Sequence, residues 1–178
     1  SSSVVLITYP DSVYSSGKPS LNILYKLITS YIGNLSSIVH ILPFLYSTSD
    51  GGFAVSSHKT IDKAFGCWKD LRKISEERII MGDIVLNHVS SRHQWVEDFV
   101  KDKKPGSKYI LSPSKKDNWQ NVFRPRNTSL FKTIQTINGP RDVWTTFGPD
   151  QIDVNWSEPK ILVEYLKLIV LYLENGIS

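Results

Sequence analysis

Hydrophobic residues fall into short runs along this chain, and the runs alternate with segments of helical spacing. Runs rich in Val, Ile and Leu occupy residues 4–8, 38–42 and 79–86, and each predicts a buried strand. Between the first two runs, apolar residues recur at helical spacing, with Ser20 as the predicted N-cap and Gly33 as the stop. The strands begin about 35 to 40 residues apart, which is typical of successive βα units around a parallel sheet.

The rhythm breaks after the third run. Residues 90–157 contain one short helical stretch, 94–100, and are otherwise rich in Lys, Pro, Asn and aromatic residues. We expect an irregular excursion here, and irregular segments of this length are usually functional. A long helix follows, with Ser157 as a candidate N-cap, Pro159 in its first turn and Gly176 just past its end. The predicted domains are the first βα units at 1–89, an inserted loop or small subdomain at 90–157, and the third helix of the series at 158–178.

Composition changes this picture little. Of the 178 residues, 40% are apolar and 21% are charged, a balance typical of a folded globular chain. The net charge is +4 without a basic stripe, so we expect no nucleic-acid partner. No apolar run reaches the roughly 18 residues of a membrane span, so we expect no membrane partner either. The single cysteine, Cys67, allows no intrachain disulfide, which favours a reducing compartment and a cytoplasmic location.

Polar residues gather where the second and third predicted strands end. Asp50 is followed by two glycines and Phe53, and Asp83 shares one face of the third predicted strand with Asn87, just before His88. In βα barrels, the carboxyl ends of the strands carry the active site. Each residue also has a purely structural interpretation: an ordinary Asp-Gly turn for Asp50, a tie to Asn87 or a nearby loop for Asp83, and a satisfied structural histidine for His88.

These segments resemble a known family. The stretch "HILPFLYSTSDGGF" is similar to the second-strand region of sucrose phosphorylases, and "MGDIVLNHVSSRHQW" to the first signature of the α-amylase family, glycoside hydrolase family 13. The stretches "FRPRN" and "VWTTFGPDQIDVNWSEP" look like the loop that follows in the sucrose phosphorylase branch. The resemblance implies the fold class α/β, as the N-terminal portion of a (β/α)8 TIM barrel. Since a complete barrel usually needs about 250 residues, we expect this chain to be incomplete.

The resemblance assigns roles residue by residue. Asp50 matches the aspartate that grips hydroxyls of the bound glucosyl unit, His88 the histidine at its far hydroxyl, and Phe53 an aromatic wall of that pocket. A carboxylate accepts hydrogen bonds from a pair of sugar hydroxyls, and aromatic rings suit the apolar face of a pyranose. Asp83 and Asn87 are expected to support this pocket.

The same resemblance assigns an acceptor subsite. Arg126 matches an arginine that meets phosphate or the leaving sugar, and Phe147 and Gln151 match residues that line the subsite. A guanidinium suits a phosphate dianion better than an ammonium does. Arg124 lies one alternation away, and the sequence does not decide which of the two arginines points inward. No metal and no cofactor are implied.

The catalytic pair of the family is expected elsewhere. Its nucleophilic aspartate follows the fourth strand and its acid/base glutamate the fifth, so both are expected beyond Ser178. The resemblance thus implies a sucrose phosphorylase, acting on an α-glucoside and phosphate by retaining double displacement, with a full-length homodimer as an expected assembly. Alternatives are a glucosylglycerate-type phosphorylase, a hydrolase of the same family and a truncated, non-catalytic sugar-binding relative. Residues 1–178 alone are expected to be inactive and poorly stable.

Overall fold

The computed structural model describes residues 4–114, 118, 122 and 127–178. The chain forms two compact units. Unit 1 comprises residues 1–46, 58–84 and 166–178, and unit 2 comprises residues 47–57 and 85–165. The predicted domain boundaries at residues 89 and 157 follow the order of βα units along the chain, whereas the two compact units follow contacts in space. The predicted boundaries therefore stay a prediction.

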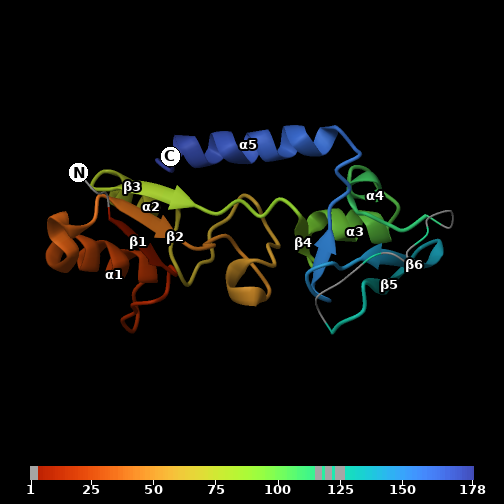
Figure 1. Cartoon of the computed structure of the whole chain (residues 1–178), viewed down its shortest axis with the longest axis horizontal. Helices are drawn as coiled ribbons and strands as arrows, with labels where there is room; N and C mark the ends of the chain where they lie inside the picture. Colours follow the sequence, from red (N-terminus) through yellow and green to blue (C-terminus); the bar gives the residue numbers. More distant parts are fainter. Residues whose placement is uncertain (1–3, 115–117, 119–121, 123–126) are drawn as a thin grey trace. The chain divides into compact units, whose positions relative to one another are not determined.

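Unit 1 contains a parallel sheet of three strands (Figure 1). The strands are β1 (Val5–Thr8), β2 (Ile38–Ile41) and β3 (Ile79–Gly82), and they lie in the order β1-β2-β3. Val5 pairs with Ile38 and Ile38 with Ile79, and both pairings are parallel. The predicted order and direction of the three strands are confirmed.

Burial alternates along these strands, as the two-residue period of a pleated sheet requires. Val39, Ile41 and Ile80 are fully buried, whereas Ile7 is 62% exposed and Met81 43% exposed. The buried residues share a core with α1 (Ser20–Leu27) and α2 (Trp68–Ser75). One face of the sheet is therefore covered by helices, and the other leaves large apolar side chains accessible.

The first helical segment follows its predicted span but not its predicted cap. After α1 the chain continues as a π-helical turn, η1 (Ile28–Ile32), and a 3-10 turn, η2 (Gly33–Leu35). The N-cap is Pro19, whose carbonyl accepts from Asn22 N–H, so Ser20 is the first helical residue and its predicted capping role is wrong. Gly33, with a positive φ of 50°, ends η1 and begins the 3-10 turn.

The third strand is shorter than predicted. Its ladder with β2 ends where Ile41 pairs with Gly82. Because β2 itself ends there, just before Pro43, the following residues have no partner on that side and leave the strand. Asp83 and Asn87 therefore do not share one face of a strand, and that prediction is wrong.

The last helix, α5 (Lys160–Glu174), begins just after Pro159. Ser157 is not its N-cap, because the helix begins three residues later, and the Lys160 N–H donates to the Glu158 side chain across 3.2 Å. Gly176 follows the helix with a φ of 82°, as predicted, and a Cβ there would lie 2.2 Å from Ser75 Oγ. Ile177 then forms a parallel bridge with Ile80, so the chain returns to the free edge of β3.

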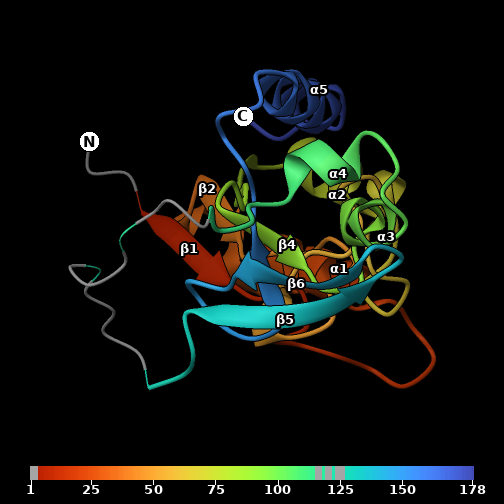
Figure 2. The same ribbon diagram turned by 90° about the vertical axis from the view of Figure 1, so that its right-hand side faces the viewer.

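Unit 2 is far more regular than the predicted excursion. Strands β4 (His88–Ser90) and β7 (Gln151–Asp153) form an antiparallel pair, as do β5 (Phe131–Thr136) and β6 (Gly139–Trp144). The expectation of irregular structure is wrong here, because β5 and β6 pair from Phe131–Trp144 to Thr136–Gly139, which leaves only Ile137 and Asn138 in the turn between them. Figure 2 shows the two strands side by side. The helix predicted at 94–100 is confirmed as α3 (Gln94–Val100), and α4 (Gly106–Tyr109) follows it.

The hairpin and α3 share one core. Phe99, Val143 and Ile152 are fully buried, and the Arg141 guanidinium lies 4.4 Å above the Phe99 ring. This cation–π contact covers the outer side of the core with an aliphatic stem and a charged head. Helix, hairpin and the short β4–β7 pair therefore hold each other in place.

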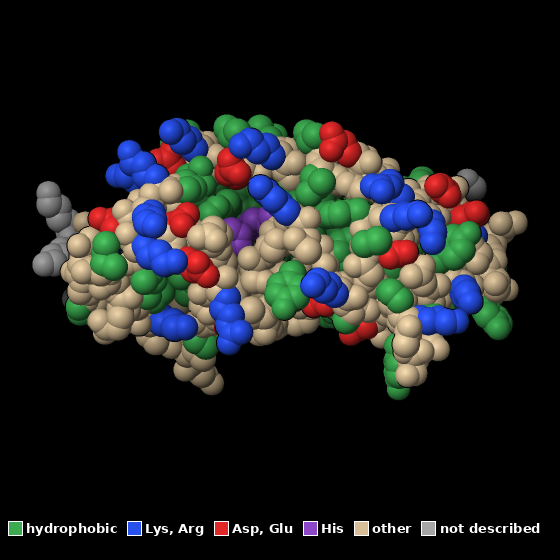
Figure 3. Space-filling view, turned by 180° about the vertical axis from the view of Figure 1, so that it is seen from behind, with side chains coloured by type: hydrophobic (Ala, Val, Ile, Leu, Met, Phe, Trp, Pro, Cys, Tyr) green, Lys and Arg blue, Asp and Glu red, His purple; other side chains and the backbone are tan. Residues whose placement is uncertain are grey.

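The surface carries mixed charge. Lys and Arg side chains are spread over the face seen in Figure 3, with Asp and Glu side chains between them. Among the described residues, no helix combines the length and hydrophobicity needed to cross a membrane.

Candidate functional site

Backbone pairing in unit 2 brings three chain segments together. In the β4–β7 ladder, His88 lies opposite Asp153 and Ser90 lies opposite Gln151. The Ser90 N–H donates to the carbonyl of Val55 across 2.8 Å, which places the segment of residues 47–57 beside β4. Residues that are far apart in the sequence thereby reach one place.

Gln151 links two of the predicted site residues. Its side-chain nitrogen donates to Asp50 Oδ2 across 2.6 Å and lies 3.1 Å from His88 Nε2. Gln151 and His88 are buried, whereas Asp50 is exposed. A buried amide therefore orients an accessible carboxylate, and the carboxylate keeps acceptor positions for a ligand.

His88 Nε2 faces two protein groups. It lies 3.1 Å from the carbonyl oxygen of Phe53 as well as 3.1 Å from the Gln151 amide nitrogen. The carbonyl can only accept and the amide nitrogen can only donate, so Nε2 hydrogen-bonds one of them, depending on its tautomer. The Phe147 ring packs against the imidazole with ring centroids 4.7 Å apart. His88 is thus held on several sides beside the Asp50 carboxylate.

The turn that carries Asp50 has an unusual backbone. Asp50 has a φ of 57°, and Gly51 and Gly52 follow with 59° and 100° within η3 (Asp50–Gly52). Asp tolerates the left-handed region better than most residues, but glycine alone enters it without cost. Phe53 N–H donates back to the Asp50 carbonyl across 3.0 Å and closes the turn. The Asp-Gly-Gly sequence is therefore what presents this carboxylate at the site.

A second carboxylate, that of Asp150, binds the residues that directly precede this turn. Asp150 Oδ2 accepts from Thr48 Oγ1 and from Ser49 Oγ, each across 2.6 Å, and Oδ1 accepts from Ser91 Oγ. Burial alone raises the pKa of the Asp150 carboxyl, but these three hydroxyl donors and the Ser91 amide outweigh it and lower the pKa below its ordinary value. Asp150 is consequently ionised at neutral pH.

The chemistry of this site suits hydroxyl groups. The exposed Asp50 carboxylate offers acceptors to hydroxyl groups of a ligand, and the buried Gln151 amide and His88 imidazole hold it in place beside the Phe147 ring. Among the described residues, no group of three or more His, Cys, Asp or Glu side chains could hold a metal ion. The arrangement places an exposed carboxylate beside a buried amide and imidazole and an aromatic ring.

Residues 26–178 match the family model described as "Alpha amylase, catalytic domain". The chain belongs to the alpha-amylase family. The predicted fold class, the N-terminal portion of a (β/α)8 barrel, is confirmed by this match and by a solved structure. That structure, sucrose 6F-phosphate phosphorylase from Thermoanaerobacter thermosaccharolyticum, has a TM-score of 0.87 at 30% identity, over 99% of this chain and 38% of the other.

Curated relatives of this alpha-amylase family member are phosphorylases. The glucosylglycerate phosphorylase of Allomeiothermus silvanus is 37% identical over 172 residues, covering 97% of this chain and 31% of the relative. The sucrose phosphorylase of Agrobacterium vitis is 32% identical over 166 residues, covering 86% of this chain and 33% of the relative. The resemblance to the sucrose phosphorylase branch is thereby confirmed. The chain spans about a third of the length of these relatives.

The structure brings together most of the residues that the family resemblance singled out. Asp50, His88, Phe147 and Gln151 meet through the contacts above, and Phe53 joins them through its carbonyl. Arg126 lies outside the described residues, as does Arg124. The roles assigned to all these side chains stay predictions.

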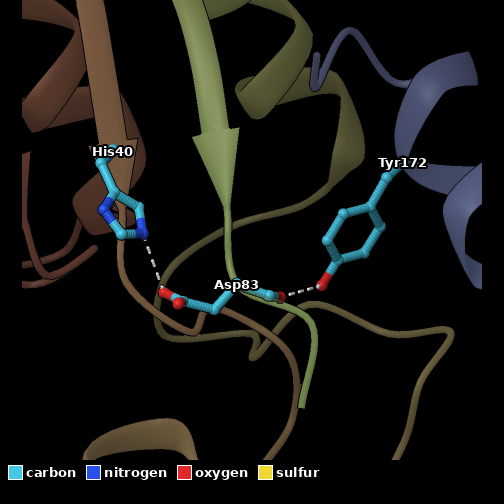
Figure 4. Close-up of polar contacts among 3 residues, drawn as sticks. All are labelled: His40, Asp83 and Tyr172. Atoms are coloured by element: carbon cyan, nitrogen blue, oxygen red, sulfur yellow. Dashed lines mark hydrogen bonds and ion pairs between the residues drawn. The ribbon is translucent and has the colours of Figure 1, made fainter. Parts of the chain in front are cut away.

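The two residues expected to support the pocket behave differently. The Asp83 carboxylate lies 3.1 Å from His40 Nε2 on β2, and the Asp83 carbonyl accepts from the Tyr172 hydroxyl across 3.2 Å (Figure 4). The described contacts of Asp83 are therefore made within unit 1. Asn87 is exposed, and its carbonyl accepts from Val154 N–H across 3.0 Å beyond the β4–β7 ladder.

Sequence reasoning missed Asp150 and the hydroxyls around it. The segment Ser47-Thr48-Ser49 looks like ordinary loop composition, and Asp150 looks like a turn residue after Pro149. Only the fold shows that the two segments meet. The clustering of hydroxyl residues just before Asp50 and at Ser90-Ser91 was the one available signal.

Proposed function

We propose that this chain supplies the glucosyl-binding part of a glucosyl-transferring phosphorylase of the alpha-amylase family. The observation that carries the proposal is the Gln151 amide, which joins the Asp50 carboxylate to the His88 imidazole. Asp50 would accept hydrogen bonds from neighbouring sugar hydroxyls, and His88 would contact the far hydroxyl of the same ring. Two curated relatives that are themselves phosphorylases support this assignment.

The reaction would be a retaining double displacement. An aspartate attacks the anomeric carbon, the bond to the leaving sugar breaks, and a glutamic acid protonates the departing oxygen. Hydrogen phosphate then attacks the anomeric carbon of the β-glucosyl-enzyme and gives its proton to the glutamate. This step releases α-glucose 1-phosphate and regenerates the free aspartate and the glutamic acid. The family resemblance implies that this aspartate and glutamate follow later strands, beyond Ser178, and we propose that residues 1–178 contribute sugar contacts. Arg126 is proposed to meet the phosphate or the leaving sugar.

Sucrose is the proposed donor, with fructose as the leaving group. Glucosylglycerate is the second candidate, because the relative with 37% identity is a glucosylglycerate phosphorylase. We further propose that the enzyme works in the cytoplasm, as the single cysteine in residues 1–178 favours a reducing compartment.

The test is an assay of the intact protein, as its gene encodes it, with each donor in the presence and absence of phosphate. The proposal predicts glucose 1-phosphate from sucrose or glucosylglycerate, formed only when phosphate is present. Release of free glucose at the same rate without phosphate would instead identify a hydrolase. A complete lack of turnover, with weak sugar binding retained, would identify a non-catalytic relative.

A further inference from the structure

Asp150 fixes the direction of a chain of hydrogen bonds. A carboxylate only accepts, so Thr48 must donate its single hydroxyl proton to Asp150. The contact of 2.5 Å between Thr48 Oγ1 and Ser90 Oγ then requires Ser90 as the donor. Ser90 Oγ in turn accepts from the Arg92 N–H across 3.0 Å. One series of donors therefore runs from β4 through Thr48 to Asp150, and such a series strengthens each of its members.

The groups that Asp150 holds are neighbours of the sugar-site residues. Thr48 and Ser49 directly precede Asp50, and Gln151 directly follows Asp150. Asp50 has a φ of 57°, a conformation that a non-glycine residue keeps only when its surroundings enforce it. Asp150 thus anchors the turn that carries Asp50, and it directly precedes the start of β7, which carries Gln151. The two partners of the Asp50–Gln151 hydrogen bond are both held next to it.

We propose that Asp150 is a positioning residue for the sugar site. Its carboxylate holds Thr48, Ser49 and Ser91, and thereby fixes the Asp50 carboxylate against the Gln151 amide before a sugar binds. This inference rests on the proposed function, in which Asp50 and His88 contact the substrate and Gln151 joins them. Asp150 makes its bonds to protein hydroxyls, so its contribution is preorganisation of the site rather than contact with the sugar.

The charge of Asp150 matters for this role. The hydroxyl donors hold the pKa of Asp150 low, so the group is an ionised acceptor under ordinary conditions. Hydrogen bonds to an ionised acceptor are roughly twice as strong as those between neutral groups. An asparagine of the same size would turn an N–H₂ donor toward some of the hydroxyls that now donate to Asp150. Those hydroxyls would have to accept instead, and part of the chain of hydrogen bonds would change direction.

The first test is spectroscopic and independent of activity. In the intact protein labelled with ¹⁵N, the Gln151 side-chain amide is identified by its loss in Gln151→Ala. We expect its proton exchange to quicken about tenfold in Asp150→Ala, because the bond to Asp50 opens more often. Asp150→Asn keeps the size of the side chain, and it should give a rate of Gln151 amide exchange between those of the wild type and Asp150→Ala. Asp142→Asn is the control, because Asp142 also accepts a hydroxyl hydrogen bond, from Thr133, in the same unit.

Unchanged Gln151 exchange in Asp150→Asn and in a folded Asp150→Ala would overturn the positioning role. Should Asp150→Ala fail to fold, Asp150→Asn alone decides between the two outcomes. The Asp142→Asn control is expected to leave the Gln151 signal as it is in the wild type.

The second test is kinetic. Loss of preorganisation should raise the KM for the glucosyl donor about tenfold in Asp150→Ala, with a smaller change in kcat, since Asp50 binds the donor in the ground state too. A drop in thermal midpoint with an unchanged KM would show a merely structural role and contradict the proposal. If the wild-type protein transfers no glucosyl group, the proposed function fails, and amide exchange still decides whether Asp150 positions the Asp50–Gln151 pair.

Discussion

The side-chain amide of Gln151 donates a hydrogen bond to the Asp50 carboxylate across 2.6 Å, although the two residues are 101 positions apart in the sequence. The same amide nitrogen lies 3.1 Å from His88 Nε2. A buried amide thus sets the geometry of the two groups that the family resemblance assigns to sugar binding. The site depends on how the start of β7 meets the turn after β2.

Gly148→Ala tests the placement of Gln151. A Cβ on Gly148 would lie 2.9 Å from Gln151 Oε1, so the added methyl group should push the amide away from Asp50. We expect a KM for the glucosyl donor about fivefold higher, equivalent to the loss of roughly 1 kcal/mol from one hydrogen bond. Steady-state kinetics of the intact protein measure this change.

A double-mutant cycle supplies the control for Gly148→Ala. In a Gln151→Ala background, the substitution at Gly148 should have almost no further effect on KM, because the displaced group is already absent. Full additivity of the two effects would show that Gly148→Ala acts by another route.

Gly106→Ala should destabilise unit 2. A Cβ at this position would lie 2.0 Å from the Trp95 carbonyl oxygen and 2.5 Å from Asp98 Cβ, both on α3. Overpacking against a backbone atom costs about 1–3 kcal/mol, which denaturant unfolding would detect. Gly82→Ala is the matched control, since its Cβ would meet neighbours at 3.4 Å, an ordinary contact. Equal stability losses in the two variants would contradict the packing of α4 on α3.

Tyrosine ionisation should limit stability at high pH. Burial raises the pKa of Tyr165 and of Tyr172 above the ordinary value of 10.0, and the Asp83 charge raises that of Tyr172 further. Each pKa is higher in the folded state than in the unfolded state, so above pH 10 the unfolded chain loses these phenol protons more readily than the folded chain does. The free energy of unfolding should therefore be unaffected by these groups below pH 10 and should decline as the pH rises further. Urea unfolding at a series of alkaline pH values would show the decline.

Substitutions separate this effect from general alkaline denaturation. Tyr172→Phe and Tyr165→Phe should each make the free energy of unfolding depend less steeply on pH. Tyr14→Phe, at a residue that is 85% exposed, should keep the wild-type slope. Identical slopes in all three variants would show that neither buried phenol is responsible.

The sequence was a good guide to local elements and to their order. Three apolar runs predicted β1, β2 and β3 in parallel order, because β-branched runs separated by helical spacing have few other arrangements. The stretch 94–100 formed a helix as predicted. The resemblance to the sucrose phosphorylase branch also identified Asp50, His88, Phe147 and Gln151, which the structure brings into contact.

What the sequence did not reveal depends on contacts between distant segments. The third strand ends at Gly82 because its partner β2 ends, and no property of residues 83–86 themselves shows this. The β5–β6 hairpin was hidden because its few apolar residues do not alternate regularly with polar ones, as Phe131 and Ile134 in β5 show. The role of Asp150 could not be predicted, since its donors lie about 60 and 100 positions away in the chain.

The sugar-binding role of this site is tested most directly by comparing kcat/KM of the intact wild-type protein with that of Asp50→Ala, using the α-glucoside that it phosphorolyses. Loss of charge-assisted hydrogen bonds to the sugar should lower kcat/KM roughly 10- to 150-fold, which corresponds to a loss of about 1.5–3 kcal/mol of transition-state stabilisation. The wild-type Asp142 carboxylate contacts Thr133 on the hairpin, so Asp142→Asn is the control and should keep the wild-type value. An unchanged kcat/KM in folded Asp50→Ala would contradict the assignment of Asp50, and with it the location of the sugar site beside Gln151 and His88.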